Sequence, residues 1–531
     1  MVASIRSEPR TFNRLSARDS STDLVATLTQ ARLIRINKQT QEVEPWLADR
    51  WSADTDGRRL TLHLRPNVVF SDGHPFTSDD VLFSFEAVYD ARAASALADS
   101  LQVTGKKLGV HAVDAQTVAI TFPTPFAPGI RLLDFLPILP RHKLGAALKN
   151  GTFASAWGLS TPPSEIAGLG PFVLSEYVPG QRLVFARNPR YWRTLPDGGH
   201  LPKLDRVVVE IISDQNAELL RLGAGQLDVT SGEIAPEAYA TVKRSADAGR
   251  VKIIDLGIGE ADSLWFNLKP GRFGHDSRAA WLQRDELRRA ISLAVDRRAF
   301  ADTVFLGAGE PVYGPETPAN KKWYWTGTPV TPHDPAGAKA MLAAVGLTDR
   351  NGDGQLEDPH GTPVRFTLVT QKGRPRLERG AAVVREELEK IGVAVDVVAL
   401  DANAVFERIG SGEYDAVYFH PSRSDPDPAL TPDFWFSAGT AHLWNMAQPK
   451  PATEWEARID DLMTRQSATL DETERKRLFD EVQRIFCEHA PVLYFAAPRV
   501  LVAMSSRVVN ASPAVALAPV LWSPDTVAVV R

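Results

Sequence analysis

Cysteine is almost absent from this sequence. Cys487 is the single cysteine among 531 residues, which excludes an internal disulfide framework and any metal cluster held by several thiolates. Cys487 lies among the regularly spaced apolar residues of a predicted helix, which favours a packing role over a catalytic one. Long apolar runs are also missing, since no stretch approaches the ~20 uninterrupted apolar residues of a membrane-spanning helix. We therefore expect a soluble chain.

Charge of one sign is lacking as well. The chain has 60 Lys and Arg against 65 Asp and Glu, a formal net charge of −5, and the charged residues form no long blocks. This balance argues against a nucleic-acid-binding protein and against a polybasic membrane-surface protein. The 44% of apolar residues is typical of a globular chain. At roughly 150 residues per domain, the length allows about three to four domains.

Familiar catalytic motifs are absent too. The sequence has no G-x-x-x-x-G-K-[ST] phosphate loop, no complete dinucleotide fingerprint, no G-x-S-x-G elbow and no H-E-x-x-H helix. Its 11 histidines are scattered singly. We therefore expect neither an enzyme nor a resident cofactor. A hydrolase whose catalytic groups meet only after folding stays the alternative.

Strand and helix patterns alternate along the chain and predict a mixed α/β fold. A hairpin is expected around the turn Asp56-Gly57, and Thr77 or Ser78 is expected to begin a helix. Capping patterns at Thr453 and Asp471 predict two late helices. Further strands are predicted at 2–5, 117–122, 172–175, 183–186 and 206–212, and helix–strand alternation typical of βαβ packing is predicted over 378–391, 393–398 and 415–419.

The sharpest local motif lies at 349–358. Oxygen ligands at alternate positions, with glycine at the sixth, match the first half of an EF-hand calcium loop and make candidate ligands of Asp349, Asn351 and Asp353. The twelfth position is His360, however, where the loop needs a bidentate glutamate, and residues 362–369 alternate like a strand. We prefer a solvated turn, and a structural calcium ion stays the alternative.

Many spaced segments match one known family in the same order along nearly the whole chain. They include P-W-L-A-D-R-W at 45–51, V-F-S-D-G at 69–73, G-P-F at 170–172, R-N-P-R-Y-W at 187–192, G-Q-L-D at 225–228, Y-D-A at 414–416 and D-P-D-P at 425–428. This pattern resembles the family-five extracellular solute-binding proteins, which are the peptide, nickel and oligosaccharide receptors of ABC importers.

The resemblance implies an α/β bilobal clamp of the periplasmic-binding-protein type II, cluster C-like, with an extra inserted domain. Lobe one would be discontinuous and comprise 1–43, 167–261 and 492–531. The small inserted α/β domain would be 44–166, and lobe two would be 262–491. A ligand would bind in the cleft between the lobes, and hinge closure would present it to the permease.

The resemblance also bears on the class of ligand. In peptide-binding members, an acidic residue four positions before the Asp-Pro step holds the α-ammonium of the ligand. Here that position is Ser422 when counted from Pro426 and Ser424 when counted from Pro428. A serine cannot neutralise an ammonium group, and burying an unpaired cation is costly. Free-amine peptides are therefore disfavoured, and a neutral, N-blocked, anionic or sugar-like ligand is favoured.

Aromatic and polar residues that the resemblance places near the ligand complete the candidate site. Aromatic rings could stack on a sugar or a side chain, and an arginine could hold a carboxylate or phosphate. The candidate contacts are Ser20, Ser21, Thr22, Arg408, Phe419, His420, Ser422, Arg423, Asp425, Trp444 and Asn445. For two of them a packing role is the alternative: Asp425 in a rigid turn and Trp444 in the core.

The amino terminus bears on location. Residues 2–5 read as a strand directly after Met1, without the charged start and apolar core of a secretory signal. From the residues alone, the protein is either cytoplasmic or trimmed of a signal. The resemblance favours a removed signal and a periplasmic or extracellular monomer, free or lipid-anchored. Its small-molecule ligand would be a peptide, a modified or peptide-like molecule or an oligosaccharide, delivered to ABC permease subunits. A sensory or chemotaxis receptor is the alternative within the same binding class.

Overall fold

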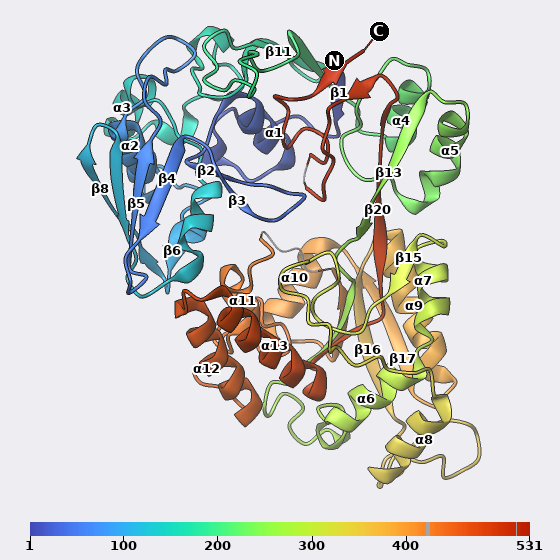
Figure 1. Cartoon of the computed structure of the whole chain (residues 1–531). Helices are drawn as coiled ribbons and strands as arrows, with labels where there is room; N and C mark the ends of the chain where they lie inside the picture. The colour runs from blue at the N-terminus through green and yellow to red at the C-terminus, as the bar shows by residue number, and fades with distance from the viewer. Residues whose placement is uncertain (421–424, 517, 531) are drawn as a thin grey trace. The chain divides into compact units, whose positions relative to one another are not determined.

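The chain folds into two compact units. The structure is a computed structural model that describes residues 1–420, 425–516 and 518–530 (Figure 1). Unit 1 comprises Met1–Leu256 and Val500–Arg531, and unit 2 comprises Gly257–Arg499. Unit 1 is therefore discontinuous in sequence. The further split of its residues into a lobe and an inserted domain at 44–166 stays a prediction, as do the domain boundaries at 261 and 491.

The chain passes between the units twice, each time inside a strand. The first passage lies in β13 (Val251–Ile258) and the second in β20 (Ala496–Ser505). These two strands are neighbours in a three-stranded sheet that β15 (Gly309–Pro311) completes. The two covalent connections therefore run side by side.

One sheet of unit 1 joins segments that lie far apart in the sequence. Its strand order is β1 (Val2–Ile5), β12 (Arg206–Ile211), β11 (Arg182–Arg187) and β10 (Phe172–Val178). β1 is parallel to β12, with Val2 opposite Val208, and the other pairs are antiparallel. In β12 the buried residues Val207 and Val209 alternate with less buried ones, whereas the last three residues of β1 are all buried. All four predicted strands are confirmed.

A second, antiparallel sheet of unit 1 has the order β4 (Ala48–Ala53), β5 (Arg59–Leu64), β9 (Thr117–Thr121) and β8 (Gly109–Asp114). The predicted hairpin turn is present, with Gly57 at φ 67°, a conformation that favours glycine. Helix α2 (Ser78–Tyr89) begins with a capping box of Thr77 and Asp80 and packs against β8, β9 and α3 (Arg141–Lys149).

Shorter elements complete unit 1. The helices are α1 (Ser20–Thr29), α4 (Gln215–Gly223) and α5 (Tyr239–Asp247), and the strands are β2 (Ile34–Ile36), β3 (Val43–Pro45), β6 (Gln102–Val103), β7 (Lys106–Lys107), β21 (Val508–Val509) and β22 (Ala528–Val529).

Unit 2 is organised around a five-stranded sheet. Its order is β17 (Ala394–Leu400), β16 (Arg365–Gln371), β18 (Ala416–Phe419), β14 (Ser263–Phe266) and β19 (Val492–Tyr494). β16 is parallel to both β17 and β18, whereas β14 is antiparallel to β18 and β19. The predicted βαβ packing is thus confirmed, with α9 (Pro375–Glu389) joining β16 to β17 and α10 (Ala402–Ser411) joining β17 to β18.

The two crossover helices of this sheet belong to different hydrophobic clusters. Leu368 and Tyr418 share a cluster with the inward side of α9, whereas Val369 and Val417 share one with Val405 of α10. Because neighbouring residues of a strand point to opposite faces, α9 and α10 cover opposite faces of the sheet. The remaining helices of unit 2 are α6 (Asp285–Ala294), α7 (Arg297–Val304), α8 (Pro335–Ala344), α11 (Pro432–Trp435), α12 (Glu454–Ala468) and α13 (Glu472–His489).

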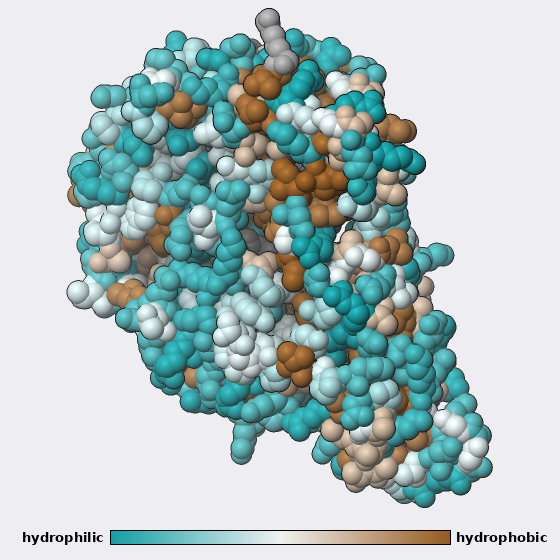
Figure 2. All heavy atoms as spheres, turned by 45° about the vertical axis from the view of Figure 1, so that its right-hand side comes forward, coloured by the Kyte–Doolittle hydropathy of each residue, from teal (hydrophilic) through white to brown (hydrophobic). Residues whose placement is uncertain are grey.

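Hydrophilic side chains dominate the face of the molecule in Figure 2. The apolar residues are mostly buried, and exposed large ones such as Leu220 and Phe406 are few. Among the helices of the described residues, none combines the length and apolar character needed to cross a membrane.

Gly380 allows close packing between α9 and the sheet. A Cβ atom at this position would lie less than 3.0 Å from the ring of Tyr418, which is fully buried. Although alanine is the better helix former, we expect Gly380→Ala to lower the free energy of unfolding by about 1–3 kcal/mol because the ring has to move. Denaturant unfolding with matched m-values measures this change.

Gly410 of α10 is the matched control, because a Cβ atom there would meet nothing within 4 Å. Gly410→Ala is expected to leave the protein unchanged or to stabilise it by up to ~1 kcal/mol through helix propensity. If both variants changed stability equally, the packing explanation for Gly380 would be wrong.

Candidate functional site

The carboxyl-end edge of the unit 2 sheet is where a ligand site is expected. The chain leaves β16 through α9 to reach β17 on one side, and it leaves β17 through α10 to reach β18 on the other side. The connection that leaves the carboxyl end of β16 thus runs away from β18, and ligands of open α/β sheets commonly bind beyond the carboxyl ends of such strands. The residues that follow β16 and β18, and those that precede the antiparallel β14, meet at this edge.

A buried carboxylate lies at this edge. The Asp262 side chain, directly before β14, has no exposed surface. Its Oδ1 accepts a hydrogen bond from Nη2 of Arg376 at 2.9 Å, and Nδ1 of His420 lies 3.1 Å from the same oxygen. Arg376 is the second residue of α9, and His420 directly follows β18. Three separate segments thus supply one charged cluster.

Tyr418 joins this cluster from within β18. Burial first, and then the negative charge of Asp262 and a hydrogen bond with it, raise the pKa of Tyr418 well above its ordinary value. Nδ1 of His420 is buried, and its geometry toward Asp262 does not form a hydrogen bond. A buried polar group left without a partner costs about 1–3 kcal/mol. Among the described residues, His420 therefore has unused hydrogen-bonding capacity.

The exposed part of the cluster is a guanidinium and an imidazole. Side chains of Arg376 and His420 are 27% and 30% exposed, whereas Asp262 is covered. A planar guanidinium presents several N–H groups and suits the oxygens of a carboxylate. Asp262 holds one of these N–H groups and so fixes the orientation of Arg376. The arrangement can accept an acidic group and cannot offer an open carboxylate to a cation.

Other predicted residues lie on or near α10. Phe419 is half-buried and packs edge-to-face against the exposed Phe406 of α10, with ring centroids 5.6 Å apart. Arg408 is exposed on the same helix. Ser422 and Arg423 lie outside the described residues, as does Ser424. The ligand contacts predicted for all of these residues stay predictions.

The Asp425 to Pro428 segment is a fixed turn. Oδ1 of Asp425 accepts a hydrogen bond from the backbone N–H of Asp427 at 2.8 Å. The Asp427 carboxylate in turn forms a buried two-pronged ion pair with Arg475 of α13, at 2.7 and 3.0 Å. This agrees with the rigid-turn alternative for Asp425, and its contact with ligand stays a prediction.

Trp444 lies in the core of unit 2, where it packs against Trp265 with ring centroids 5.8 Å apart. Its indole N–H donates to Oε1 of Glu456 at 3.1 Å. These contacts favour the packing alternative for Trp444. Asn445 is buried beside it, with 7% of its surface exposed.

Glu456 organises this segment. Its Oε1 also accepts from Gln448 at 2.9 Å and faces Nε2 of His442 at 3.2 Å, while Nδ1 of His442 faces the carbonyl oxygen of Phe434 at 3.0 Å. Both imidazole nitrogens therefore face acceptor oxygens. Burial raises the pKa of Glu456, but the hydrogen bonds from His442, Gln448 and Thr453 outweigh burial and lower it to about 2.

The predicted residues of unit 1 form the start of α1. Ser20 is exposed, whereas Ser21 and Thr22 are buried. The hydroxyl of Ser21 donates to the carbonyl oxygen of Ser7 at 2.6 Å, and that of Thr22 donates to Asp19 at 2.7 Å. Both hydroxyl groups thus already donate hydrogen bonds within unit 1. Ligand contacts by these residues stay predictions.

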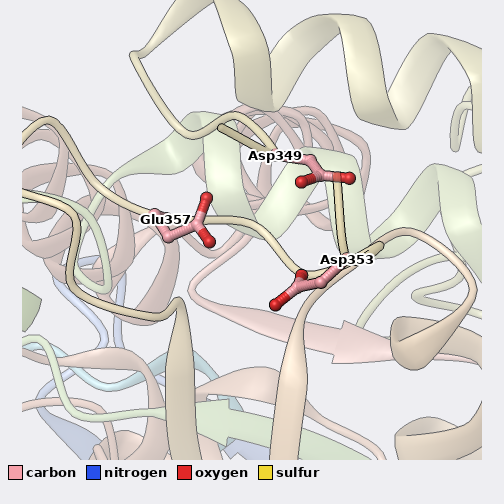
Figure 3. A group of neighbouring side chains, drawn as sticks. All are labelled: Asp349, Asp353 and Glu357. Atoms are coloured by element: carbon pink, nitrogen blue, oxygen red, sulfur yellow. The ribbon is translucent and has the colours of Figure 1, made fainter. Parts of the chain in front are cut away.

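The candidate calcium loop is an Asp/Asn turn whose oxygens accept backbone N–H groups. Asp349 accepts from Gly352 and Gly354, and Asn351 accepts from Asp353 at 2.8 Å. Ligand atoms of Asp349, Asp353 and Glu357 lie within 4.8 Å of one another (Figure 3). This network is what a solvated turn requires, so we continue to prefer the turn.

Asp262, Arg376 and Tyr418 were missed by the sequence analysis. The sequence did contain a signal for Arg376. This residue follows shortly after β16, and residues beyond the carboxyl end of a strand where the parallel sheet reverses its direction of winding often bind ligands. Asp262 had no such signal, since 114 residues separate it from Arg376.

A solved structure shares the fold over the full length. The chain superimposes on the ABC transporter substrate-binding protein CtaP from Listeria monocytogenes with a TM-score of 0.80 and 22% identity, covering 100% of this chain and 99% of that one. The two chains therefore share one fold. The predicted fold class is thereby confirmed.

The family follows from a match to its model, described as "Bacterial extracellular solute-binding proteins, family 5 Middle", over residues 42–442. The chain belongs to the family 5 bacterial extracellular solute-binding proteins. It is 28% identical to a "Probable ABC transporter-binding protein" of Deinococcus radiodurans, covering 92% of this chain and 85% of the relative. It is 26% identical to the "Probable D,D-dipeptide-binding periplasmic protein DdpA" of Escherichia coli, covering 96% and 90%. The predicted family and its solute-binding function are confirmed.

Calcium addition tests the turn at 349–358. We expect 1 mM CaCl2, compared with EGTA, to leave the melting temperature unchanged, because His360 replaces the bidentate ligand. Differential scanning calorimetry measures this. A rise of several degrees that Asp349→Asn abolishes would establish a calcium site instead.

Acid should remove the stabilisation that Glu456 provides. A carboxylate whose pKa is lowered from 4.5 to about 2 stabilises the folded state above its unfolded pKa and loses this effect as the pH falls. Relative to Glu456→Gln, the wild type should be more stable by roughly 2–4 kcal/mol above pH 5, with the difference shrinking toward pH 2. Urea unfolding between pH 3 and 7 measures the difference.

Glu389→Gln is the control for this series, because Glu389 is exposed on α9. A difference between wild type and Glu456→Gln that stayed constant from pH 3 to pH 7 would contradict the assignment.

Proposed function

We propose that this protein is the extracytoplasmic solute-binding receptor of an ABC importer and that Arg376 and His420 recognise an acidic group of its ligand. The observation that carries the second part is the cluster around Asp262, where the guanidinium of Arg376 and the imidazole of His420 are partly exposed and the carboxylate is covered. The family supports the first part. Both parts of the proposal describe binding of a ligand, and neither requires that the protein convert it chemically.

The chemistry of the edge favours an acidic or N-blocked peptide-like ligand over a free-amine peptide. An α-ammonium group needs an accessible carboxylate. Asp262 has no exposed surface and already accepts from Arg376. The name of the Escherichia coli relative, a D,D-dipeptide-binding protein, favours neither class, because a dipeptide carries both a carboxylate that Arg376 could hold and an α-ammonium group.

Location and partners are part of the same proposal. The family description supports a periplasmic or extracellular protein, and we propose a removed signal and delivery to permease subunits. Binding in an interdomain cleft with hinge closure stays a prediction, as does the monomeric state. A sensory receptor is the alternative within the binding class, and a permease and an ATPase encoded beside the gene would favour import.

Native mass spectrometry of the purified full chain tests the function, because a binding protein can retain its ligand. We expect one bound small molecule that carries a carboxylate or another acidic group and is released unchanged on denaturation. Conversion of that molecule by the protein would favour the hydrolase alternative. A retained ligand with a free ammonium group and no acidic group would contradict the ligand class.

Substitution of Arg376 tests the recognition site. Arg376→Gln should weaken binding of the released ligand about 10- to 100-fold, because a charge-assisted hydrogen bond contributes roughly 1.5–3 kcal/mol. Isothermal titration calorimetry measures the affinity. Arg385→Gln, an exposed position on the same helix, is the matched control and should bind like the wild type. Equal affinities of the two variants would remove Arg376 from the site.

A further inference from the structure

A small pocket of unit 1 lies at the carboxyl-terminal end of α1, and its volume is about 40 Å³. Segments that are far apart in the sequence supply its polar and aromatic lining. This lining includes Gln30, Arg32, Arg35, Trp46, Trp522 and Asp525. The contacts predicted at 20–22 lie at the opposite end of α1, and Arg376 belongs to unit 2. The pocket therefore shares no residue with the site proposed for the solute.

Backbone contacts fix the wall that carries Gln30 and Arg32. The backbone N–H of Gln30 donates to the carbonyl oxygen of Ala26 at 2.8 Å, and that of Leu47 donates to the carbonyl oxygen of Arg32 at 3.3 Å. Gly170 packs so closely that a Cβ atom there would lie 2.7 Å from the backbone nitrogen of Gln30. The two side chains therefore start from a fixed backbone, which lowers the cost of ordering them around a ligand.

The other charged side chains of the lining are paired. Nε and Nη2 of Arg35 donate to Glu44 at 3.0 and 2.6 Å. Asp525 accepts from the hydroxyl of Tyr191 at 3.1 Å and forms an ion pair with Arg193. Each of these two ion pairs is neutral overall, so neither gives the pocket a net charge.

Two polar atoms of the lining residues lack hydrogen-bond partners among the described residues. They are Oε1 of Gln30, a residue that is 5% exposed, and Nε of Arg32. Oε1 is an acceptor and Nε–H is a donor, and a buried polar group without a partner is destabilising. The side chain of Arg32 is 24% exposed, so a small molecule in solution can reach it. The pocket thus offers one acceptor and one donor to an occupant.

Arg32 is also a cation whose charge is incompletely offset. Its Nη2 lies 3.7 Å from Oδ1 of Asp23, and Arg14 donates to the same oxygen at 2.7 Å. Lys38 pairs with Asp134 at 3.1 Å. Burial raises the pKa of Asp134, but the charges of Lys38 and Arg32, together with hydrogen bonds, outweigh burial and lower it. Three cations thus share two carboxylates, which leaves one positive charge in excess beside the pocket.

We propose that this pocket binds one small organic carboxylate, which accepts hydrogen bonds from Arg32 and donates one to Gln30 through a hydroxyl or N–H group. The flat guanidinium group matches the two oxygens of a carboxylate, and one negative charge offsets the excess beside the pocket. Because one water molecule needs about 10–15 Å³, the volume admits only a few non-hydrogen atoms. The apolar lining, which includes Ile34 and Pro171, suits an organic anion better than a strongly hydrated inorganic one.

Titration with glycolate and with acetate tests the proposal on the unmodified full chain. Both molecules carry a carboxylate, but acetate lacks the hydroxyl that would donate to Gln30. We expect both to bind, and glycolate to bind about 3- to 10-fold more tightly because of its additional hydrogen bond. Ligand-detected NMR measures the two dissociation constants. Glycolate should bind Arg376→Gln as it binds the wild type, which separates this pocket from the site proposed for the solute.

Substitutions in the pocket locate the binding. Arg32→Gln should weaken glycolate binding about tenfold or more, because a charge-assisted hydrogen bond is lost. Gln30→Leu should keep the affinity for acetate and remove the preference for glycolate. Arg50→Gln, at an exposed arginine of the same unit, is the matched control and should bind both molecules like the wild type.

Three outcomes would overturn the proposal. They are a wild type that binds neither carboxylate, an Arg32→Gln variant that binds glycolate like the wild type, and an Arg376→Gln variant that no longer binds glycolate. The first outcome would leave water alone in the pocket, and the last would place glycolate at the site proposed for the solute.

Discussion

A carboxylate with no contact to water needs compensating charges and hydrogen bonds, and around Asp262 this requirement brings three distant segments together. Arg376 from the start of α9, His420 from the end of β18 and Tyr418 within that strand all face it. Removing one partner of such a pair is costly because the other charge stays buried. The polar edge of unit 2 is therefore specified by electrostatics as well as by the sheet.

The same requirement fixes the loops on the α12–α13 side of unit 2. Asp427 pairs with Arg475, and Glu456 collects donors from His442, Trp444 and Gln448. Each buried acid ties a segment without regular structure to a long helix. Loops held in this way keep their shape without secondary structure of their own, which is what a binding protein needs if its contacts are to be present before the ligand arrives.

Local features of the fold could be predicted from the sequence, whereas contacts between side chains that lie far apart in the sequence could not. The cap at Thr77, the turn at Gly57 and the parallel strands around α9 follow from patterns within about 30 residues. The packing of Trp444 and the pairing of Asp262 depend on partners that no periodicity reveals. The sequence shows that residue 444 is a tryptophan, but only the fold shows that its indole N–H already donates a hydrogen bond to Glu456.

The side-by-side position of β13 and β20 has a consequence for the order in which the protein is completed. Unit 2 is one uninterrupted stretch of chain, whereas unit 1 needs the segment after Val500. That segment is central to it: Leu501 accepts the backbone N–H of Ile234, and Ser505 donates its own to Asp228. When the chain is synthesised or exported from its amino terminus, unit 2 can therefore complete its fold first. Most of unit 1 is then already synthesised, but it cannot complete its fold until the segment after Val500 is available.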